Sequence, residues 1–306
     1  MNRNLKALGY RIWQARFLYV LLLPGLAYFA IFHYGPMAGL LMSFKKFNVQ
    51  EGIWASPWIG MSNFARIFTT PDAVSAIRNT FAINLSRLVF QFPAPIILAL
   101  LLNELRLSGF KRIYQTVYTF PHFLSWIIVS TLLNNFFANG GMVNTIIANM
   151  GGERINFLAD VKLFRPFLYL TANWKEMGWS SIIYMAAITG IDPTLYEAAT
   201  VDGAGRLSQA WHVTLPGIRS TIVTLFILQV GRVMNSGFEQ VFYLQNPAVK
   251  EVSDILDTYI YTITFKGNPN YAFSTAVGLF KSVINLAMLV IANRVVKSIS
   301  GEGMFA

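Results

Sequence analysis

Apolar residues gather along this chain in six long stretches, separated by polar and turn-forming segments. A helix that crosses a bilayer needs about 20 consecutive, mostly apolar residues. Six spanning helices are therefore predicted, at Phe17–Tyr34, Phe81–Leu102, Val117–Phe137, Phe167–Ile188, Ile218–Phe242 and Thr275–Val296. The first, second and sixth stretches are clear, and the fourth and fifth, which carry charges, are assigned on length and context. The pattern predicts an all-α integral membrane protein.

Composition supports this prediction. Only 12% of the 306 residues are charged, about half the roughly 25% typical of soluble domains, so most of the surface must face lipid. Lys and Arg outnumber Asp and Glu by 24 to 14. In a membrane protein such an excess collects beside cytoplasmic helix ends, so no nucleic-acid partner is expected. The absence of cysteine excludes disulfides, thiolate metal sites and cysteine nucleophiles.

The N-terminal segment, residues 1–16, is basic, with Arg3, Lys6, Arg11 and Arg16 and no acid. Short, dense basic segments stay on the cytoplasmic side, and six spans return the chain to the side where it started. Both termini are therefore predicted to be cytoplasmic. A signal peptide would have a shorter apolar run and a small-residue cleavage site, so the first helix is expected to be retained. Residues 17–306 then form one transmembrane domain.

The loop at residues 190–216 between the fourth and fifth spans has strong helix signals. Asp192-Pro193 should start a helix, because proline suits the first turn and acids favour a helix N-terminus. Asp202-Gly203 should end it, since glycine adopts positive φ easily. A second helix is predicted over residues 206–214, ending before Leu215-Pro216. Two short helices joined by a sharp turn would form a compact knob suited to docking in a cleft of another protein.

This loop resembles the EAA motif of ATP-binding cassette (ABC) importer permeases. The matching residues keep the family's spacing from Glu197 to Pro216 and are Glu197, Ala198, Ala199, Asp202, Gly203, Ala204, Val213, Leu215 and Pro216. The chain departs at Ala210, where the family has a bulky side chain, and Trp211 follows it. The likeness is greatest to permeases for sugars and oligosaccharides, including polysaccharide fragments, as Leu22–Gly35 and Gly231–Pro247 indicate.

The resemblance implies a type I ABC importer permease in a bacterial cytoplasmic membrane, with six spans and a cytoplasmic coupling helix-turn-helix. It implies a second similar permease, two ATP-binding subunits, an external solute-binding protein and an oligosaccharide substrate. ATP and Mg would bind to the partner subunits, so this chain would hold no cofactor or metal, would have no catalytic residues and would not be an enzyme. The residues expected to couple to the ATPase are Glu197, Ala198, Ala199, Asp202, Gly203, Ala204, Trp211, Leu215 and Pro216.

Ionisable residues at bilayer depth usually face a bundle interior or a water-filled cavity. In the fifth span, the set Gln229, Arg232, Ser236, Glu239 and Tyr243 is spaced for one helical face, and a break of the fourth span is expected near Trp174–Trp179. One interpretation is pairing between helices, such as Lys175 with Glu176 or Arg232 with Glu239. The other is a substrate cavity formed by Trp174, Lys175, Glu176, Trp179, Gln229, Arg232, Asn235, Glu239, Tyr243, Lys281 and Asn285.

Apart from Arg219 and Arg294 at the span ends, six charged residues lie inside the predicted spans, four of them basic, namely Arg87, Lys175, Glu176, Arg232, Glu239 and Lys281. Unpaired positive charge in a cavity of low dielectric is costly unless an anion arrives. The hypothesis is therefore an anionic, uronate-containing oligosaccharide. Arg87 is expected to be structural, capping carbonyls at a helix bend near Pro93 and Pro95.

Three alternatives stay open at this point. An ATP-independent channel or secondary transporter is one, although no internal repeat typical of many secondary carriers is visible. An intramembrane enzyme would need a convergent catalytic cluster, which the scattered His33, His122 and His212 do not supply. A permease for amino acids or phosphate would share the knob and differ only in its cavity.

Overall fold

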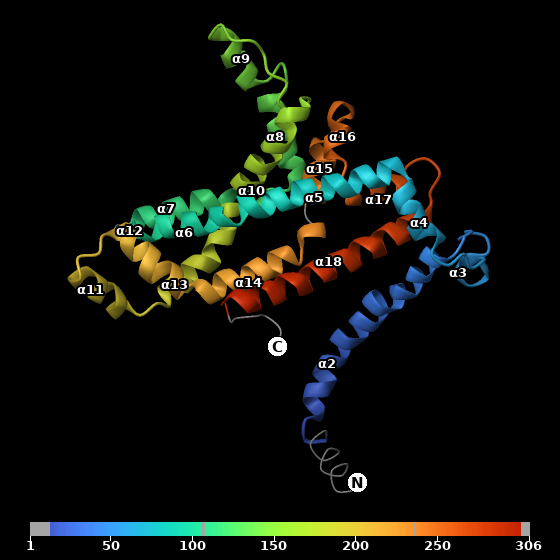
Figure 1. Ribbon diagram of the computed structural model, residues 1–306, viewed down its shortest axis with the longest axis horizontal. Coiled ribbons are helices and arrows are strands. Elements are labelled where there is room, and N and C mark those ends of the chain that lie inside the picture. Colours follow the sequence, from blue (N-terminus) through green and yellow to red (C-terminus); the bar gives the residue numbers. More distant parts are fainter. Residues whose placement is uncertain (1–12, 106–107, 236, 301–306) are drawn as a thin grey trace.

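The computed structural model describes residues 13–105, 108–235 and 237–300, which are almost entirely helical (Figure 1). The longer helices are α2 (Arg16–Phe29), α5 (Pro71–Gln91), α6 (Pro93–Asn103), α7 (Ser108–Thr119), α8 (Trp126–Phe137), α10 (Val161–Thr189), α14 (Arg219–Val230), α17 (Leu256–Phe265) and α18 (Tyr271–Ser300). The shorter elements are η1 (Ala30–Tyr34), η2 (Gly35–Phe44), α3 (Gly52–Ala55), α4 (Ser62–Thr69), η3 (Phe120–Phe123), α9 (Met142–Asn149), α11 (Pro193–Val201), α12 (Arg206–Gln209), η4 (Ala210–Thr214), α13 (Leu215–Gly217), η5 (Val233–Asn235), α15 (Phe238–Leu244), η6 (Pro247–Val249) and α16 (Lys250–Ser253). Within these ranges the only β pairing is a bridge between Lys45 and Trp58.

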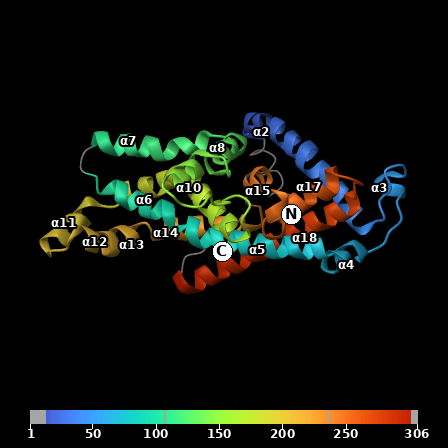
Figure 2. The same cartoon turned by 90° about the horizontal axis from the view of Figure 1, so that it is seen from above.

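The long helices form an elongated bundle in which α10 packs against α6, and α14 packs against α18. Elements α11 and α12 lie at one end of the bundle, and α3 and α4 lie at the opposite end (Figures 1 and 2). Three apolar clusters follow one another along its length, centred on Tyr184, Phe164 and Phe273. The apolar core is therefore divided among three clusters.

The predicted first, second and sixth spans are present and longer than expected. The structure extends them to Arg16–Phe44, Pro71–Asn103 and Tyr271–Ser298, and within the described residues these three helices alone pass a test of length and composition for membrane spans. Two bent helix pairs raise that number to five if each pair forms one span. Helix α10 is 29 residues long but carries charges. The count of six spans stays a prediction.

The third predicted span, Val117–Phe137, is not one straight helix. Its two halves, Gly109–Phe123 and Trp126–Asn149, meet at 100°. Pro121 lies in η3, and Leu124 and Ser125 are extended. A proline lacks the N–H that a helix needs, and two extended residues end the helical ladder. The chain therefore turns sharply beside α10.

The prediction that one helical face carries the polar residues of the fifth span is wrong. Helix α14 ends at Val230, Gly237 takes a left-handed φ of +89°, and α15 begins only at Phe238. The Asn285 side chain of α18 fits into this break, where its amide donates to the Gly231 carbonyl and its oxygen accepts from Met234 N at 3.2 Å. Ser236 lies outside the described residues. Gln229 and Tyr243 are thus on different helices.

The break expected in the fourth span is also wrong, because α10 runs unbroken from Val161 to Thr189. The Asp160 carboxylate caps its first turn and accepts from Lys162 N at 2.6 Å. The charges near its centre have partners from another segment, described below, so they do not disrupt the helix. Tertiary contacts override the local cost of these residues.

Arg87 is buried as expected of a structural residue, but it does not cap the bend near Pro93. Its guanidinium donates to the Gln240 side-chain oxygen on α15. The Gln240 amide nitrogen in turn donates to the Leu168 carbonyl at 2.9 Å and to the Thr171 hydroxyl at 2.8 Å. This network joins α5, α15 and α10.

The first helix stands apart from the rest of the chain. None of the residues in the most apolar part of the segment Arg16–Phe44 is buried, and α2 projects away from the bundle (Figure 1). Only its continuation η2 packs against α18. Most of the basic N-terminal segment, with Arg3, Lys6 and Arg11, lies outside the described residues.

Candidate coupling loop and substrate cavity

The coupling loop, residues 190–216, begins with the predicted cap. The Asp192 side chain accepts a hydrogen bond from Thr194 N at 2.9 Å, and Pro193 occupies the first turn of α11. That backbone hydrogen bond holds the pKa of Asp192 below its ordinary value, because it favours the charged carboxylate. The cap and the proline together fix where the helix starts.

The turn at Asp202-Gly203-Ala204 has the geometry of a Schellman motif. Gly203 N donates to the Thr200 carbonyl at 3.0 Å, and Ala204 N donates to the Ala199 carbonyl at 2.8 Å. Gly203 has φ of +79°, the left-handed conformation that favours glycine at this position of the motif. The spacing from Ala199 to Ala204 is therefore the spacing that closes the helix end, which confirms the predicted turn.

The second helix of the loop continues further than predicted. Instead of ending before Leu215-Pro216, the helical backbone passes through η4 into α13 (Leu215–Gly217). Pro216 lies directly after η4, in the first turn of α13. The two halves are tied together by a hydrogen bond between the Tyr196 and Thr214 hydroxyl oxygens, 3.0 Å apart.

Large apolar side chains of this loop face outward. Val201 is 88% exposed and Trp211 is 63% exposed, and Leu195 and Leu207 are exposed as well. Ala210, at the position where the sequence departs from the motif, is partly buried. A group of exposed apolar side chains is typical of an interaction surface, and Trp211 is the bulky exposed side chain beside Ala210.

The second candidate site is a cavity of about 650 Å³ in the bundle, which we call the polar cavity. It brings together four of the predicted cavity residues, namely Glu176, Trp179, Gln229 and Arg232. Its other lining residues are Gln91, Pro95, His122, Asn173, Met177, Ser180, Ile183, Tyr184, Leu225 and Leu228. Its size lies within the range of about 300–1,000 Å³ found for small-molecule sites, and its mixed lining suits a polar ligand.

The charged groups at one wall of this cavity neutralise each other. The Glu176 carboxylate lies 3.1 Å from the Lys175 ammonium and 2.8 Å from His122 Nδ1. Lys175 is buried and also donates to the His122 carbonyl at 2.8 Å. The pairing of Lys175 with Glu176, which was one of the two sequence interpretations, is therefore confirmed. An uncompensated buried charge would be costly, and this arrangement avoids that cost.

Comparison with known proteins decides the family. Residues 91–301 match the family model described as the binding-protein-dependent transport system inner membrane component. The chain belongs to this family. It is therefore a transport permease embedded in a membrane and not an enzyme, and the family-level prediction from the EAA motif is confirmed.

Individual relatives cover nearly the whole permease. The polygalacturonan/rhamnogalacturonan transport system permease protein YteP of Bacillus subtilis (strain 168) is 45% identical over 301 residues, 98% of this chain and 94% of that protein. Protein LplB of the same strain is 46% identical over 95% of this chain and 91% of that protein. A chain in the crystal structure of a bacterial ABC transporter involved in the import of the acidic polysaccharide alginate is 38% identical. It covers 96% of the permease and 99% of that chain, with a TM-score of 0.89.

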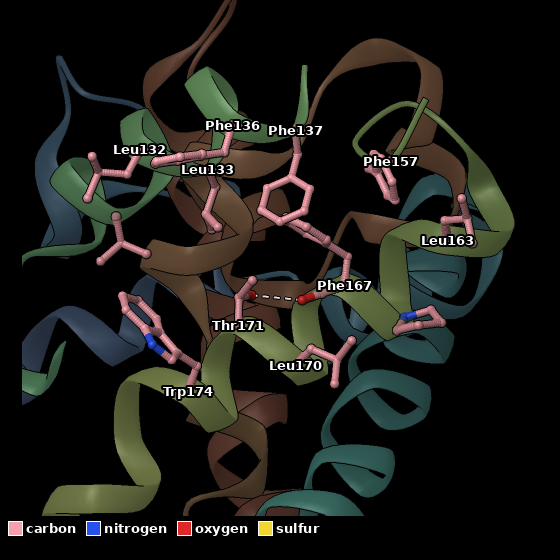
Figure 3. Close-up of a pocket in the computed structure, with 12 residues that line it drawn as sticks. Leu132, Leu133, Phe136, Phe137, Phe157, Leu163, Phe167, Leu170, Thr171 and Trp174 are labelled. Atoms are coloured by element: carbon pink, nitrogen blue, oxygen red, sulfur yellow. Dashed lines mark hydrogen bonds between the residues drawn. The ribbon is translucent and has the colours of Figure 1, made fainter. Parts of the chain in front are cut away.

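Several predicted cavity residues of the permease lie elsewhere. Trp174 lines a separate apolar pocket of about 570 Å³, formed between α8 and α10 by side chains such as Leu132, Phe136 and Phe167 (Figure 3). Lys281 pairs with Asp257 of α17, and Asn285 holds the break after α14. Asn235, within that break, and Glu239 and Tyr243, beyond it, are exposed. None of these six is among the residues that line the polar cavity.

Two residues that pair with predicted cavity residues were missed by the sequence prediction. His122 was considered only as a candidate catalytic histidine, although an ionisable residue within Phe-Pro-His-Phe at bilayer depth was a usable signal. Asp257 lies outside the predicted spans, and no sequence pattern linked it to Lys281. Among the residues that the structure describes, no three His, Asp or Glu side chains are grouped so as to hold a metal ion.

Proposed function

We propose that this chain is one of two permease subunits of an ATP-driven importer that carries oligosaccharides across a bacterial cytoplasmic membrane. The observation that carries this proposal is the 45% identity, over 98% of the chain, to a permease named for polygalacturonan and rhamnogalacturonan transport. The likeness to an alginate importer supports it. Three long spans, the bent pair of Gly109–Phe123 with Trp126–Asn149, helix α10, and helix α14 with the segment after it would make the six crossings.

We infer the orientation of the chain in the membrane from the elements that lie at the two ends of the bundle. The coupling loop lies at one end, and α3 and α4 lie at the other (Figure 1). A cytoplasmic coupling loop would place α3 and α4 outside the cell. Helix α18 contacts α4 near its beginning and α14 further on, so its end would return to the cytoplasmic side. Both termini are then cytoplasmic, as the basic N-terminal segment predicts.

The proposed partners are a second similar permease, two ATP-binding subunits that hold ATP and Mg, and an external solute-binding protein. A solved relative is a complex with an alginate pentasaccharide-bound periplasmic protein, which supports the last of these. The exposed Val201, Leu207 and Trp211 would seat in a cleft of one ATP-binding subunit. Their burial there would remove apolar surface from water.

We propose that the loop transmits movement of the ATP-binding subunits to the membrane helices. Its Schellman turn and its Tyr196–Thr214 bond make it one unit, and Arg206 reaches Glu104 at the end of α6 with a separation of 3.7 Å. Closure of the ATP-binding subunits around ATP would draw the loops of the two permeases together. The attached helices α6 and α14 would then open the pathway outward, and hydrolysis would reset it inward.

The acidic substrate hypothesis keeps its support, but on new grounds. Asp257 balances Lys281, so the positive surplus counted inside the spans is smaller than the sequence suggested. Arg232 lines the polar cavity. Two relatives are named for polymers that carry carboxylates. We therefore propose fragments of acidic polysaccharides as the substrate class.

Reconstitution of the complete importer tests this proposal. Proteoliposomes holding the permease pair and the ATP-binding subunits, supplied with the binding protein, are expected to take up oligogalacturonates only when ATP is present inside. Uptake is measured with radiolabelled oligomers. Neutral malto-oligosaccharides of equal length are the control and should enter at least about tenfold more slowly. Uptake that needs no ATP would favour a secondary transporter, and equal uptake of neutral oligomers would remove the acidic assignment.

Arg232→Gln is expected to lower uptake of the acidic oligomer about tenfold, the effect of losing one charge-assisted hydrogen bond of roughly 1.5 kcal/mol. The matched control is Lys297→Gln, which removes an exposed positive charge near the end of α18. That variant should transport like the wild type. If both variants behave alike, Arg232 does not recognise the carboxylate.

An amino-acid or phosphate permease remains the second candidate within the same family. Such a permease would have the same coupling loop, so only the cavity can distinguish it from an oligosaccharide permease. A cavity of about 650 Å³ that carries an indole together with several amide and hydroxyl groups favours a sugar over a compact anion. Competition by phosphate or free amino acids in the uptake assay would reverse this preference.

A further inference from the structure

His122 stands at the sharp turn between α7 and α8, and helix α10 holds it at three points. Its Nδ1 lies 2.8 Å from the Glu176 carboxylate, and its carbonyl accepts from the Lys175 ammonium at 2.8 Å. Its imidazole stacks on the indole of Trp179, with ring centroids 4.5 Å apart and an angle of 4° between the planes. These contacts hold the imidazole ring in one orientation.

The backbone contact beneath this cluster is unusually close. A Cβ atom at Gly178 would lie 2.0 Å from the Tyr118 carbonyl oxygen, so only glycine lets α10 approach the end of α7 this closely. The side chains of the neighbouring residues can therefore reach His122. The cluster is part of the helix contact and not a flexible surface group.

Trp179 is fixed by these contacts and yet accessible. The parallel imidazole covers one indole face, and Phe123 meets the indole in an edge contact with centroids 5.7 Å apart. The side chain is nevertheless 45% exposed and lines the polar cavity. Part of the indole surface is therefore left uncovered by the imidazole and Phe123. The cavity thus contains a rigid aromatic plane.

We propose that the free face of Trp179 is a stacking platform for one pyranose ring of the transported oligosaccharide, and that His122 is the positioning residue that holds the platform. The proposal rests on the proposed function. Aromatic faces are negative and attract the positively polarised C–H bonds on one side of a sugar ring. The hydroxyl groups at the ring edge would meet side chains of the same cavity, among them Ser180 and Gln229.

The apolar pocket provides an internal contrast. Trp174 lies on the same helix and is 44% exposed, almost the same as Trp179. Its surroundings are hydrocarbon side chains, and the Thr171 hydroxyl there bonds back to the Phe167 carbonyl at 2.8 Å (Figure 3). A sugar ring placed against Trp174 would lose hydrogen bonds to water without replacing them. The two tryptophans therefore make a matched pair.

The test measures binding of a radiolabelled oligogalacturonate to the assembled importer in nanodiscs without the binding protein. Trp179→Leu is expected to weaken binding about tenfold, the upper range for one aromatic contact, and Trp174→Leu should stay within about twofold of the wild type. Equal binding by Trp179→Leu and wild type, or equal weakening in both variants, would overturn the platform. If Trp179→Leu does not assemble, Trp179→Phe is expected to bind about threefold more weakly, and unchanged binding by that variant would overturn it instead.

The positioning role of His122 needs its own variants. His122→Ala removes the stacked ring and should weaken binding about as much as Trp179→Leu, whereas His122→Phe keeps a flat ring against the indole and should recover most of the affinity. Both variants are compared at equal yield of assembled complex. Equal losses in the two variants would contradict positioning by stacking. A wild-type complex that assembles but neither binds nor transports an oligosaccharide would instead refute the proposed function.

Discussion

Replacing Gly203 by proline is expected to abolish ATP-driven uptake while the membrane helices remain folded. Proline fixes φ near −65° and has no N–H, whereas Gly203 has φ of +79° and donates to the Thr200 carbonyl. The Schellman turn cannot form with proline at this position. A cost of about 3 kcal/mol or more corresponds to at least about a hundredfold loss of the native loop.

The control for this variant lies two residues away. Gly205 has φ of −69°, which proline adopts without strain, so Gly205→Pro should couple normally. The measurement pairs oligosaccharide uptake with the ATPase activity stimulated by the loaded binding protein. Loss of both in Gly203→Pro, with the subunit still inserted in the membrane, is the expected result. Normal uptake by Gly203→Pro would argue strongly that this loop does not dock to an ATPase.

Gly178→Val is expected to give a large loss of stability. The added Cβ would lie 2.0 Å from the Tyr118 carbonyl oxygen and 2.8 Å from Thr119 N. Both are backbone atoms, so no side-chain rotation relieves the clash, and α10 must move away from α7. Overpacking of a core costs about 1–3 kcal/mol even where side chains can adjust, so a cost above this range is expected here.

The thermal midpoint of the purified complex in detergent measures the effect of Gly178→Val, and binding of the oligosaccharide should fall with it because the His122 cluster separates. Gly278→Ala is the control. An added Cβ at Gly278 meets no atom within 4 Å, and alanine is favoured over glycine inside a helix by roughly 0.5–1 kcal/mol. A midpoint for Gly178→Val equal to that of Gly278→Ala would show that the approach of α10 to α7 is looser than the structure has it.

The sequence predicted the features that depend on neighbouring residues. Asp192-Pro193 and Asp202-Gly203 set a helix start and a helix end through local hydrogen bonds and φ alone, so the coupling loop could be derived without its surroundings. Hydropathy likewise located α2, the α5–α6 helix and α18. It could not show the direction of the backbone, and the bend at Leu124 and the break before Gly237 were therefore missed.

The remaining predictions failed for one reason. At each of these places, a contact with a distant segment of the chain determined the local structure. Helix α10 stays intact through Lys175 and Glu176 because His122 supplies a carbonyl acceptor for Lys175 and a hydrogen-bond partner for Glu176. Lys281 is balanced by Asp257. The polar residues of the predicted stripe were separated because Asn285 of another helix stabilises the break between them. No spacing rule along a single helix contains this information.

The two interrupted helices also determine where the protein is hydrated. Backbone groups that leave a helix at membrane depth need a protein partner or water, since lipid offers neither donor nor acceptor. At the turn near His122 and at the break after Val230, side chains from α10 and α18 satisfy some of these groups. The rest of the exposed backbone requires that these turns face a partner protein or a water-filled passage. We therefore expect the side of the bundle with the irregular segments to face water or a partner protein, and the opposite side to face lipid.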